Sequence, residues 1–138
     1  MTLTDAPYQP DAPPGGLGES YYPDLLSFYT GFLAPLIRRR DGGGRRWCAE
    51  WWRHAEVVAR LTALWHAWEA LRMEPGTGMS TWWTYHFEPC FSVLADAERG
   101  PFQACDGKHK DKLKPLPHTP LPSEWIAVWS GPPTERSN

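Results

Sequence analysis

The sequence predicts an all-α protein, a small domain of three main helices with a long central helix as its spine. Three observations support this prediction. Apolar residues recur at helical spacing in three stretches of the chain, and glycine or proline ends each stretch. Nine of the 138 residues are tryptophans, which can supply much of a modest core. We further expect an irregular, Pro-rich C-terminal segment that wraps over the long helix, pinned by zinc.

The chain length favours a single folded domain, which we place over residues 20–120. Residues 1–19 are rich in proline, glycine and acid and have almost nothing to bury, so they predict a flexible tail. Residues 121–138 combine a short apolar island with a polar end. The formal net charge of −2 provides no overall field that would attract nucleic acid or an anionic membrane.

The first predicted helix begins near Pro23 and Asp24, since proline suits the first helical position and an acid suits the positive end of the helix dipole. Apolar residues then recur at helical spacing over 25–36. Pro35 cannot donate a backbone hydrogen bond and crowds the preceding turn, so we expect a kink or a break there. The three glycines at 42–44 end this element.

The second and longest predicted helix runs from Trp47 to about Met73. Its apolar stripe follows a 4-3-4-3 spacing and consists of Val57, Leu61, Leu64, Trp68 and Leu71. On the opposite face Glu56 precedes Arg60 by four residues, the favourable order for a helical ion pair. The run Glu74-Pro75-Gly76 ends the helix.

A third helix is predicted to begin with Ser80 or Thr81 as its cap and to continue through Leu94. Pro89 lies inside it, so the helix either kinks or restarts at this proline. The chain beyond residue 100 is irregular until residues 123–129, a short apolar island with Ser123 as a plausible cap.

Four cysteine and histidine residues suggest a metal site. His86 and Cys90 are four residues apart, and so are Cys105 and His109. On a helix that spacing sets the Cβ atoms roughly 5–6 Å apart, enough to span two corners of a tetrahedral site. Two cysteines and two histidines form a closed structural ligand set, so the pattern predicts Zn²⁺ at these residues, with His118 as a substitute for His109. Alternatively, the cysteines are core residues and His109 is a surface residue.

The arginine cluster consists of Arg38, Arg39, Arg40, Arg45 and Arg46, which flank the three glycines. Arginines beside tryptophans suit phosphate contacts and base stacking, so the cluster is a candidate site for nucleic acid or another anion. Alternatively, these side chains form a solvated helix end, where cations suit the helix dipole.

Cys48 is the one candidate nucleophile that the sequence offers. It lies beside Arg45 and Arg46 at the expected start of the long helix, a setting that lowers the pKa of a thiol. The alternative is a small core residue packed under neighbouring tryptophans. The chain contains no GxSxG, HExxH or GxGxxG motif, so the sequence favours a protein that is not an enzyme.

The apolar island near the C-terminus is a candidate docking segment, because tryptophan is enriched at binding hot spots. The residues expected to contact a partner are Trp125, Ile126 and Trp129. Alternatively, the island folds back onto the core of its own domain.

The tryptophan string and the residues after it resemble a known family. The residues concerned are Trp47-Cys48-Ala49-Glu50-Trp51-Trp52-Arg53-His54, Leu64-Trp65-His66-Ala67-Trp68-Glu69, Pro75-Gly76-Thr77-Gly78-Met79-Ser80 and Gly100-Pro101-Phe102. Over Tyr22 to Pro117 the chain resembles the actinobacterial family called domain of unknown function 4913. The family tends to have proline where Ala55 stands here, and often histidine at position 90, an exchange that would suit a metal ligand.

This resemblance implies a cytoplasmic actinobacterial protein, often encoded near mobile or conjugative elements, with no assigned activity. An odd cysteine count without a leader argues against disulfides, and the apolar stretches are too short to span a membrane. We therefore expect a cytoplasmic, non-catalytic interaction or adaptor module with a protein partner and no membrane. The alternatives are a nucleic-acid-binding accessory protein that uses the arginine cluster and a cysteine-dependent enzyme or redox-sensitive protein.

Overall fold

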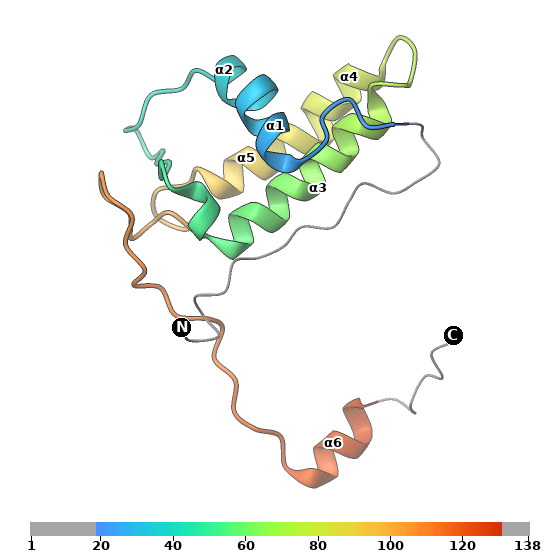
Figure 1. Ribbon diagram of the computed structural model, residues 1–138. Helices are drawn as coiled ribbons and strands as arrows, with labels where there is room; N and C mark the ends of the chain where they lie inside the picture. The colour runs from blue at the N-terminus through green and yellow to red at the C-terminus, as the bar shows by residue number, and fades with distance from the viewer. Residues whose placement is uncertain (1–18, 131–138) are drawn as a thin grey trace.

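The structure, a computed structural model, describes residues 19–130 (Figure 1). All regular secondary structure in that range is helical, with no strand, and irregular segments connect the helices. In chain order the helical segments are α1 (Leu25–Phe28), η2 (Tyr29–Leu33), α2 (Ala34–Leu36), η3 (Trp51–Arg53), α3 (Ala55–Leu71), α4 (Gly78–Thr81), η4 (Trp82–Phe87), α5 (Glu88–Leu94) and α6 (Ser123–Trp129). Adjoining segments make four main helices: the first helix (α1, η2 and α2), α3, the third helix (α4, η4 and α5) and α6. The all-α prediction is confirmed, but its count of three is one short, because the apolar island forms α6. Most of the predicted flexible tail, 1–18, lies outside the described residues.

The first and third helices each continue through a proline that we expected to kink or break them. Pro35 lies in α2 directly after the π-helical segment η2, and Pro89 lies in α5 directly after the π-helical segment η4. A π-helical turn pairs each carbonyl with the amide five residues on. This wider pairing, just before each proline, is a physical reason why its ring and its missing N–H are tolerated.

The ends of these helices differ in part from the sequence-based expectations. Asp24 caps α1 by accepting a hydrogen bond from the Ser27 amide at 2.7 Å, whereas Pro23 precedes the helix. The predicted cap at Ser80 or Thr81 is wrong, because α4 already begins at Gly78 without a side-chain cap. A Cβ atom at Gly78 would lie 2.0 Å from the Leu71 carbonyl oxygen, so the close approach of the two helices requires glycine there.

The long helix α3 begins at Ala55, not at Trp47 as predicted. The backbone of His54 is extended, with φ −101° and ψ 110°, and the short 3₁₀ segment η3 precedes it. A proline, which the resembling family tends to carry at position 55, would suit such a helix start. Cys48 and His54 therefore precede α3, and the periodicity of that helix does not fix the directions of their side chains.

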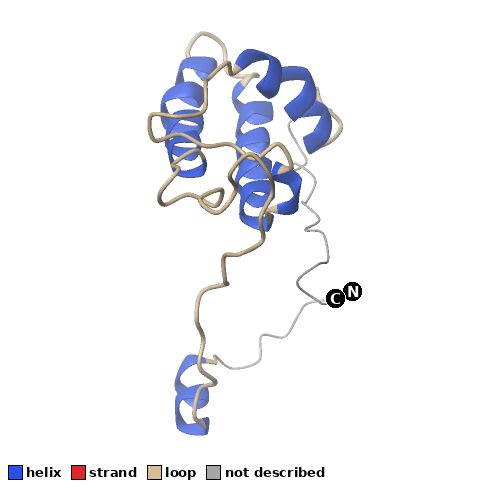
Figure 2. Cartoon of the chain, turned by 90° about the vertical axis from the view of Figure 1, so that its left-hand side faces the viewer, coloured by secondary structure: helices blue, strands red, loops and turns tan. Residues whose placement is uncertain are grey.

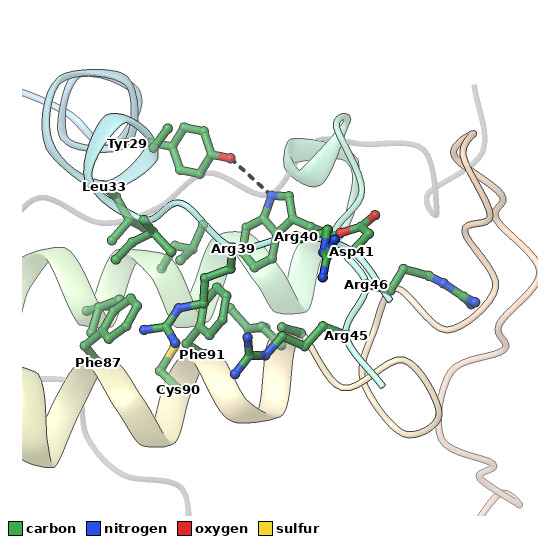
Figure 3. Close-up of a pocket in the computed structure, with 17 residues that line it drawn as sticks. Tyr29, Leu33, Arg39, Arg40, Asp41, Arg45, Arg46, Phe87, Cys90 and Phe91 are labelled. Atoms are coloured by element: carbon green, nitrogen blue, oxygen red, sulfur yellow. Dashed lines mark hydrogen bonds between the residues drawn. The ribbon is translucent and has the colours of Figure 1, made fainter. Parts of the chain in front are cut away.

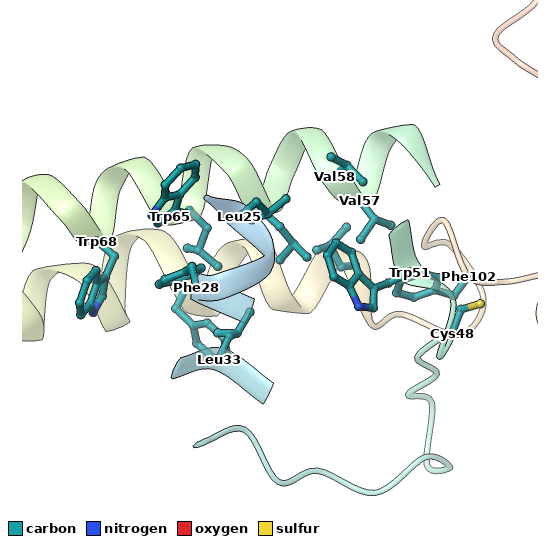
Figure 4. Packing of buried hydrophobic residues seen from close by; sticks show 14 of the residues in the cluster. Leu25, Phe28, Leu33, Cys48, Trp51, Val57, Val58, Trp65, Trp68 and Phe102 are labelled. Atoms are coloured by element: carbon teal, nitrogen blue, oxygen red, sulfur yellow. The ribbon is translucent and has the colours of Figure 1, made fainter. Parts of the chain in front are cut away.

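The core lies between the first helix, α3 and the third helix (Figure 4). Its largest fully buried side chains include Trp82, Phe28, Phe87 and Phe102. The indole of Trp82 donates a hydrogen bond to the Leu64 carbonyl oxygen at 3.0 Å, which satisfies its polar atom within the apolar surroundings.

A buried carboxylate, Glu69, ties the start of the described chain to α3. It accepts hydrogen bonds from the backbone amides of Tyr21 and Tyr22 at 2.7 and 2.9 Å. It also accepts from the Trp65 indole at 3.1 Å and from Arg72 at 2.9 Å. This carboxylate is therefore fully partnered, as a buried charge has to be.

The C-terminal arm, residues 111–130, leads away from the helical core (Figures 1 and 2). Every residue of this arm is exposed, and α6 packs against no other helix of the described chain. The segment is irregular before α6, as predicted, but the expectation that it wraps over the long helix is wrong. Among residues 19–130 no helix has the length and apolar character needed to cross a membrane.

Candidate metal centre

Two cysteines and two histidines from distant parts of the chain converge at one end of the core. Cys48, His54, Cys105 and His109 each direct a ligand atom into a space in which all four atoms lie within 4.8 Å of one another. Within residues 19–130 no other group of three or more cysteine, histidine or acidic residues is placed closely enough to hold a metal ion. Both cysteines are buried and both histidines are partly buried.

The first pair of ligands comes from the segment that leads into α3. The 3₁₀ segment η3 is closed by hydrogen bonds from the Arg53 amide to the Glu50 carbonyl oxygen and from the His54 amide to the Trp51 carbonyl oxygen, at 3.0 and 3.1 Å. This tight turn brings Cys48 and His54 to the same side of the chain. The ring of Phe102 meets the His54 ring edge-on, at a centroid distance of 4.9 Å, and orients the imidazole.

The second pair comes from the loop that follows the third helix. The Cys105 amide donates to the Phe102 carbonyl oxygen at 2.9 Å, and Gly107, with φ +70°, reverses the chain so that His109 returns toward Cys105. The Lys110 amide lies 3.5 Å from the Cys105 sulfur, as a donor would to a thiolate. Neither pair depends on a regular helix for its geometry.

Four of the six distances between the ligand atoms are close to those expected around one tetrahedral metal ion. With Zn–S bonds of about 2.3 Å and Zn–N bonds of about 2.0 Å, tetrahedral ligand atoms lie about 3.3 to 3.8 Å apart. His109 Nδ1 lies 3.6 Å from Cys48 Sγ, 3.9 Å from Cys105 Sγ and 3.1 Å from His54 Nε2. Cys105 Sγ lies 3.5 Å from His54 Nε2. The residues present therefore fit a single ion of that size and coordination number.

Burial shifts the pKa values of two members of this cluster, His54 and Cys48. It is the main reason why the pKa of the His54 imidazole is lowered, and the nearby His109 lowers it further. Burial is also the main reason why the pKa of the Cys48 thiol is raised, with a further contribution from Cys105. The expectation that Arg45 and Arg46 lower the Cys48 pKa is therefore wrong. A neutral imidazole is ready to bind a metal, whereas the thiol must release its proton to do so.

The structure brings together only half of the ligand set that we predicted. Cys105 and His109 belong to the cluster, but His86 and Cys90 do not. His86 is exposed on the third helix, and the Cys90 sulfur faces the Arg60 carbonyl oxygen of α3 at 4.0 Å. His118, the predicted substitute, is exposed in the arm. The third helix thus turns Cys90 toward α3 and away from the C-terminal loop.

The sequence patterns did not predict Cys48 and His54 as members of the cluster. Cys48 is a candidate nucleophile by its sequence context and His54 belongs to the tryptophan string, but a helix from Trp47 would set them six residues apart on different faces. A break after His54 was the one signal that could have paired them. The proline that the family resemblance leads one to expect at position 55 would have marked that break, but alanine stands there.

The arginine cluster does not act as one unit in the structure. Arg39 pairs with Glu88 at 3.3 Å and lies over the Phe91 ring at 5.2 Å. Arg46 donates to the Gln103 carbonyl oxygen at 2.5 Å, and Arg38 donates to the Pro35 carbonyl oxygen at 3.3 Å. Among the described residues the side chains of Arg40 and Arg45 have no hydrogen-bond or ionic partner.

The three residues expected to contact a partner lie on the exposed helix α6. Trp125 is 52% exposed, Ile126 50% and Trp129 73%. In the structure the island does not fold back onto the core. The capping expectation is not met here either, because Ser123 is the first residue of α6 and no side chain caps the helix.

Fold and site together define a small helical domain in which the lead-in to its long helix and a C-terminal loop converge on a Cys₂His₂ cluster. The chain belongs to the family described as "Domain of unknown function (DUF4913)", whose model matches residues 22–122. This match confirms the resemblance, and the matched range includes all four cluster residues but not α6. No curated protein and no solved structure matches the chain.

Proposed function

We propose that this protein is a non-catalytic interaction module in which a structural zinc ion ties the base of the C-terminal arm to the helical core. The observation that carries the proposal is the convergence of Cys48 and His54 with Cys105 and His109 at distances that suit one tetrahedral ion. In this arrangement the metal sets the point from which the arm presents α6 to a partner protein.

The donor set favours zinc among the common biological metals. Two thiolates and two imidazoles in a tetrahedral arrangement are the usual ligands of structural zinc, whereas calcium and magnesium require oxygen ligands. The space between the four side chains holds cysteine and histidine donors only. Because zinc binding stabilises the ordered ligand loops, it would fix the turn at 105–110, which has few apolar contacts of its own.

The same donor set favours a structural role over a catalytic one. Four protein ligands leave no coordination position for a water molecule or a substrate. The buried Cys48 thiol, with its raised pKa, is also a poor nucleophile in the metal-free protein. The cysteine-dependent enzyme considered from the sequence therefore has the weaker support.

The partner surface that we propose is the apolar side of α6. Trp125 and Trp129 are four residues apart in one helix, and both expose more than half of their surface. Large exposed aromatic side chains on an otherwise unpacked helix are the residues that most often carry binding energy in interfaces. An accessory role near a mobile element and an actinobacterial origin remain predictions from the resemblance.

Elemental analysis of untagged protein, purified without chelator, tests whether the cluster binds zinc. We expect about one zinc per chain, because the cluster can hold a single ion. Replacing Cys48→Ala and Cys105→Ala together should abolish zinc binding and lower the melting temperature. The matched control is His86→Ala/Cys90→Ala, which removes the pair first predicted from the sequence and should leave the zinc content unchanged. Zinc-free wild-type protein, or loss of zinc in the control alone, would contradict the proposal.

The variant Trp125→Ser/Trp129→Ser tests whether α6 is the surface that contacts a partner protein. Since both side chains are exposed, the variant should keep its zinc and its melting temperature but lose the proteins that crosslink to the wild-type chain in its host cells. Leu116→Ser, at an exposed apolar residue of the arm outside α6, is the control and should retain the same crosslinks. A destabilised double variant would show that α6 packs on its own core, and unchanged crosslinks would exclude α6 as the contact.

A further inference from the structure

A cavity lies between the first helix, the loop at 39–47 and α5 (Figure 3). None of the four residues of the metal cluster lines it. Its volume is about 160 Å³. The deep walls are apolar and belong to the buried core: Leu33, Leu61, Leu64, Phe87 and Leu94. Trp47 and Phe91 add aromatic surface, and the Tyr29 hydroxyl on the wall accepts a hydrogen bond from the Trp47 indole at 3.1 Å.

The rim of this cavity is arginine-rich. Arg39, Arg40, Arg45 and Arg46 line it together with one acid, Asp41. The charge of Arg39 is already offset by Glu88, and in Figure 3 the side chain of Arg46 points away from the cavity. Arg40 and Arg45 are left without partners among the described residues. Arg46 donates to a neutral carbonyl oxygen, which does not offset its charge. Four arginines against Asp41 and Glu88 therefore leave the rim with a net positive charge.

The backbone holds Arg45 firmly at this rim. The amide of Arg45 donates to the Gly42 carbonyl oxygen at 3.1 Å, in a turn whose three glycines all have positive φ. On either side of Arg45 the chain is tied to the end of the third helix: the Arg46 amide donates to Ala95 at 2.8 Å, and the Ala97 amide donates to Gly44 at 2.9 Å. Main-chain hydrogen bonds thus place the Arg45 side chain beside the cavity, and its guanidinium group takes no part in them.

We infer that this cavity binds a small amphiphilic carboxylate, with a single aromatic ring or short alkyl chain inside and its carboxylate on Arg40 and Arg45. Size supports this class, because an apolar cavity of about 150 Å³ is known to bind benzene. Charge supports it as well, since the rim is positively charged and a guanidinium fork matches a carboxylate. This inference is independent of the metal centre and of the proposed role of α6.

Nucleic acid, the anion first considered for the arginine cluster, fits these observations less well. Binding to a phosphate backbone would use all the exposed arginines as a diffuse positive surface. Here three arginines of the cluster, Arg38, Arg39 and Arg46, are engaged within the protein, and the two free ones border an apolar cavity. The two ligand classes therefore make opposite predictions for Arg38, which belongs to the cluster but does not line the cavity.

The test is an NMR titration of the full zinc-loaded chain, labelled with ¹⁵N, with 3-phenylpropionate and separately with octanoate as probes. We expect saturable shifts of the amides at 40–47 and in α5. The neutral analogue 3-phenyl-1-propanol should bind at least about tenfold more weakly, because a charge-assisted hydrogen bond is lost. Absence of saturable shifts with both carboxylates, or equal binding of the neutral analogue, would overturn the inference.

Three variants locate the site. Arg40→Gln/Arg45→Gln should weaken binding about tenfold or more, while Arg38→Gln should leave it unchanged. Cys90→Leu fills the cavity without altering its charge and should also weaken binding. Unchanged helical circular dichroism and zinc content show that each variant is folded. Equal weakening by Arg38→Gln, or saturable binding of an oligonucleotide in place of the carboxylates, would assign the cluster to a diffuse anion surface and reject the cavity.

Discussion

The helical core and α6 are both rich in tryptophan, yet they use it in opposite ways. Trp65 and Trp82 are 2% and 0% exposed in the core, whereas Trp125 and Trp129 on α6 are 52% and 73% exposed. Every indole has the same affinity for an apolar environment. The difference lies in the neighbouring elements, because α3 and the third helix face each other while no described helix faces α6.

The metal centre lies at the boundary between these two regions. Cys105 is part of the core cluster and only 2% exposed, and beyond Lys110 every described residue is exposed. We therefore expect the order of the loop at 105–110 to depend on metal binding by the four-residue cluster, whereas the order of the core comes from apolar packing. The expected effects of substitutions are therefore larger in the buried core than at exposed residues.

The largest effect is expected for a core tryptophan. Trp82→Ala should lower the free energy of unfolding by about 3–5 kcal/mol, because it opens a cavity and leaves the Leu64 carbonyl oxygen without its indole donor. Trp125→Ala on α6 should change it by no more than about 0.5 kcal/mol. Urea denaturation of both variants measures the contrast, and equal losses would remove the distinction between core and arm.

A smaller loss is expected at the close contact between α3 and α4. In Gly78→Ala the added Cβ atom would overlap the Leu71 carbonyl oxygen, so one helix end must shift, at a cost of about 1–3 kcal/mol. Gly43→Ala is a useful comparison, because nothing lies within 4 Å of a Cβ atom there and the cost comes from its φ of +59° alone. Thermal unfolding should separate the two variants. A Gly78→Ala protein as stable as the wild type would mean that these helices are less closely packed.

Glu69 gives the core a specific pH dependence. Burial raises the pKa of its carboxyl, but the hydrogen bonds from Tyr22, Tyr21, Arg72 and Trp65 outweigh burial and lower it overall. A lowered folded-state pKa contributes stability that is present above the unfolded value of about 4.3 and is lost as the pH falls through the folded value.

Glu69→Gln should therefore destabilise the protein by about 1–3 kcal/mol at neutral pH, because donors at the site lose their charged acceptor. The variant should also lose less stability than the wild type between neutral pH and pH about 3. Urea unfolding at a series of pH values measures both effects. Parallel pH profiles for the two proteins would show that Glu69 does not titrate as described.

The smallest effect is expected for the ion pair between Arg39 and Glu88. Both side chains are partly exposed, at 32% and 53%, so a double-mutant cycle should give a coupling energy of about 0.2–1 kcal/mol that decreases with added salt. The exposed pair Arg60 and Glu56, at 2.9 Å within α3, is a control that should give a similar value. A coupling several times larger would show that the ion pair is shielded from solvent more than its exposure indicates.

Parts of the candidate site could be predicted from the sequence, and parts could not. The spacing of Cys105 and His109 predicted that these two residues lie together, as they do in the cluster, because residues this close in the chain stay together in almost any turn. Their partners could not be predicted, since Cys48 is 57 residues away from Cys105 and no local pattern links the two. Cys48 and His54 join the cluster, whereas His86 and Cys90 do not. This difference depends on which face the third helix turns toward α3.

By itself, the sequence determined the helical class and the approximate positions of the first three helices, because apolar periodicity and helix-ending residues act over a few neighbouring positions. The family followed from the tryptophan string and its neighbours. Only the tertiary structure decided that α3 starts at Ala55, that two prolines lie within continuous helices, and that Cys48 and His54 meet the C-terminal loop. The reason is that alanine at position 55 is compatible with both a continuing and a starting helix. The break at His54 depends on contacts such as the Phe102 ring, which comes from 48 residues further along the chain.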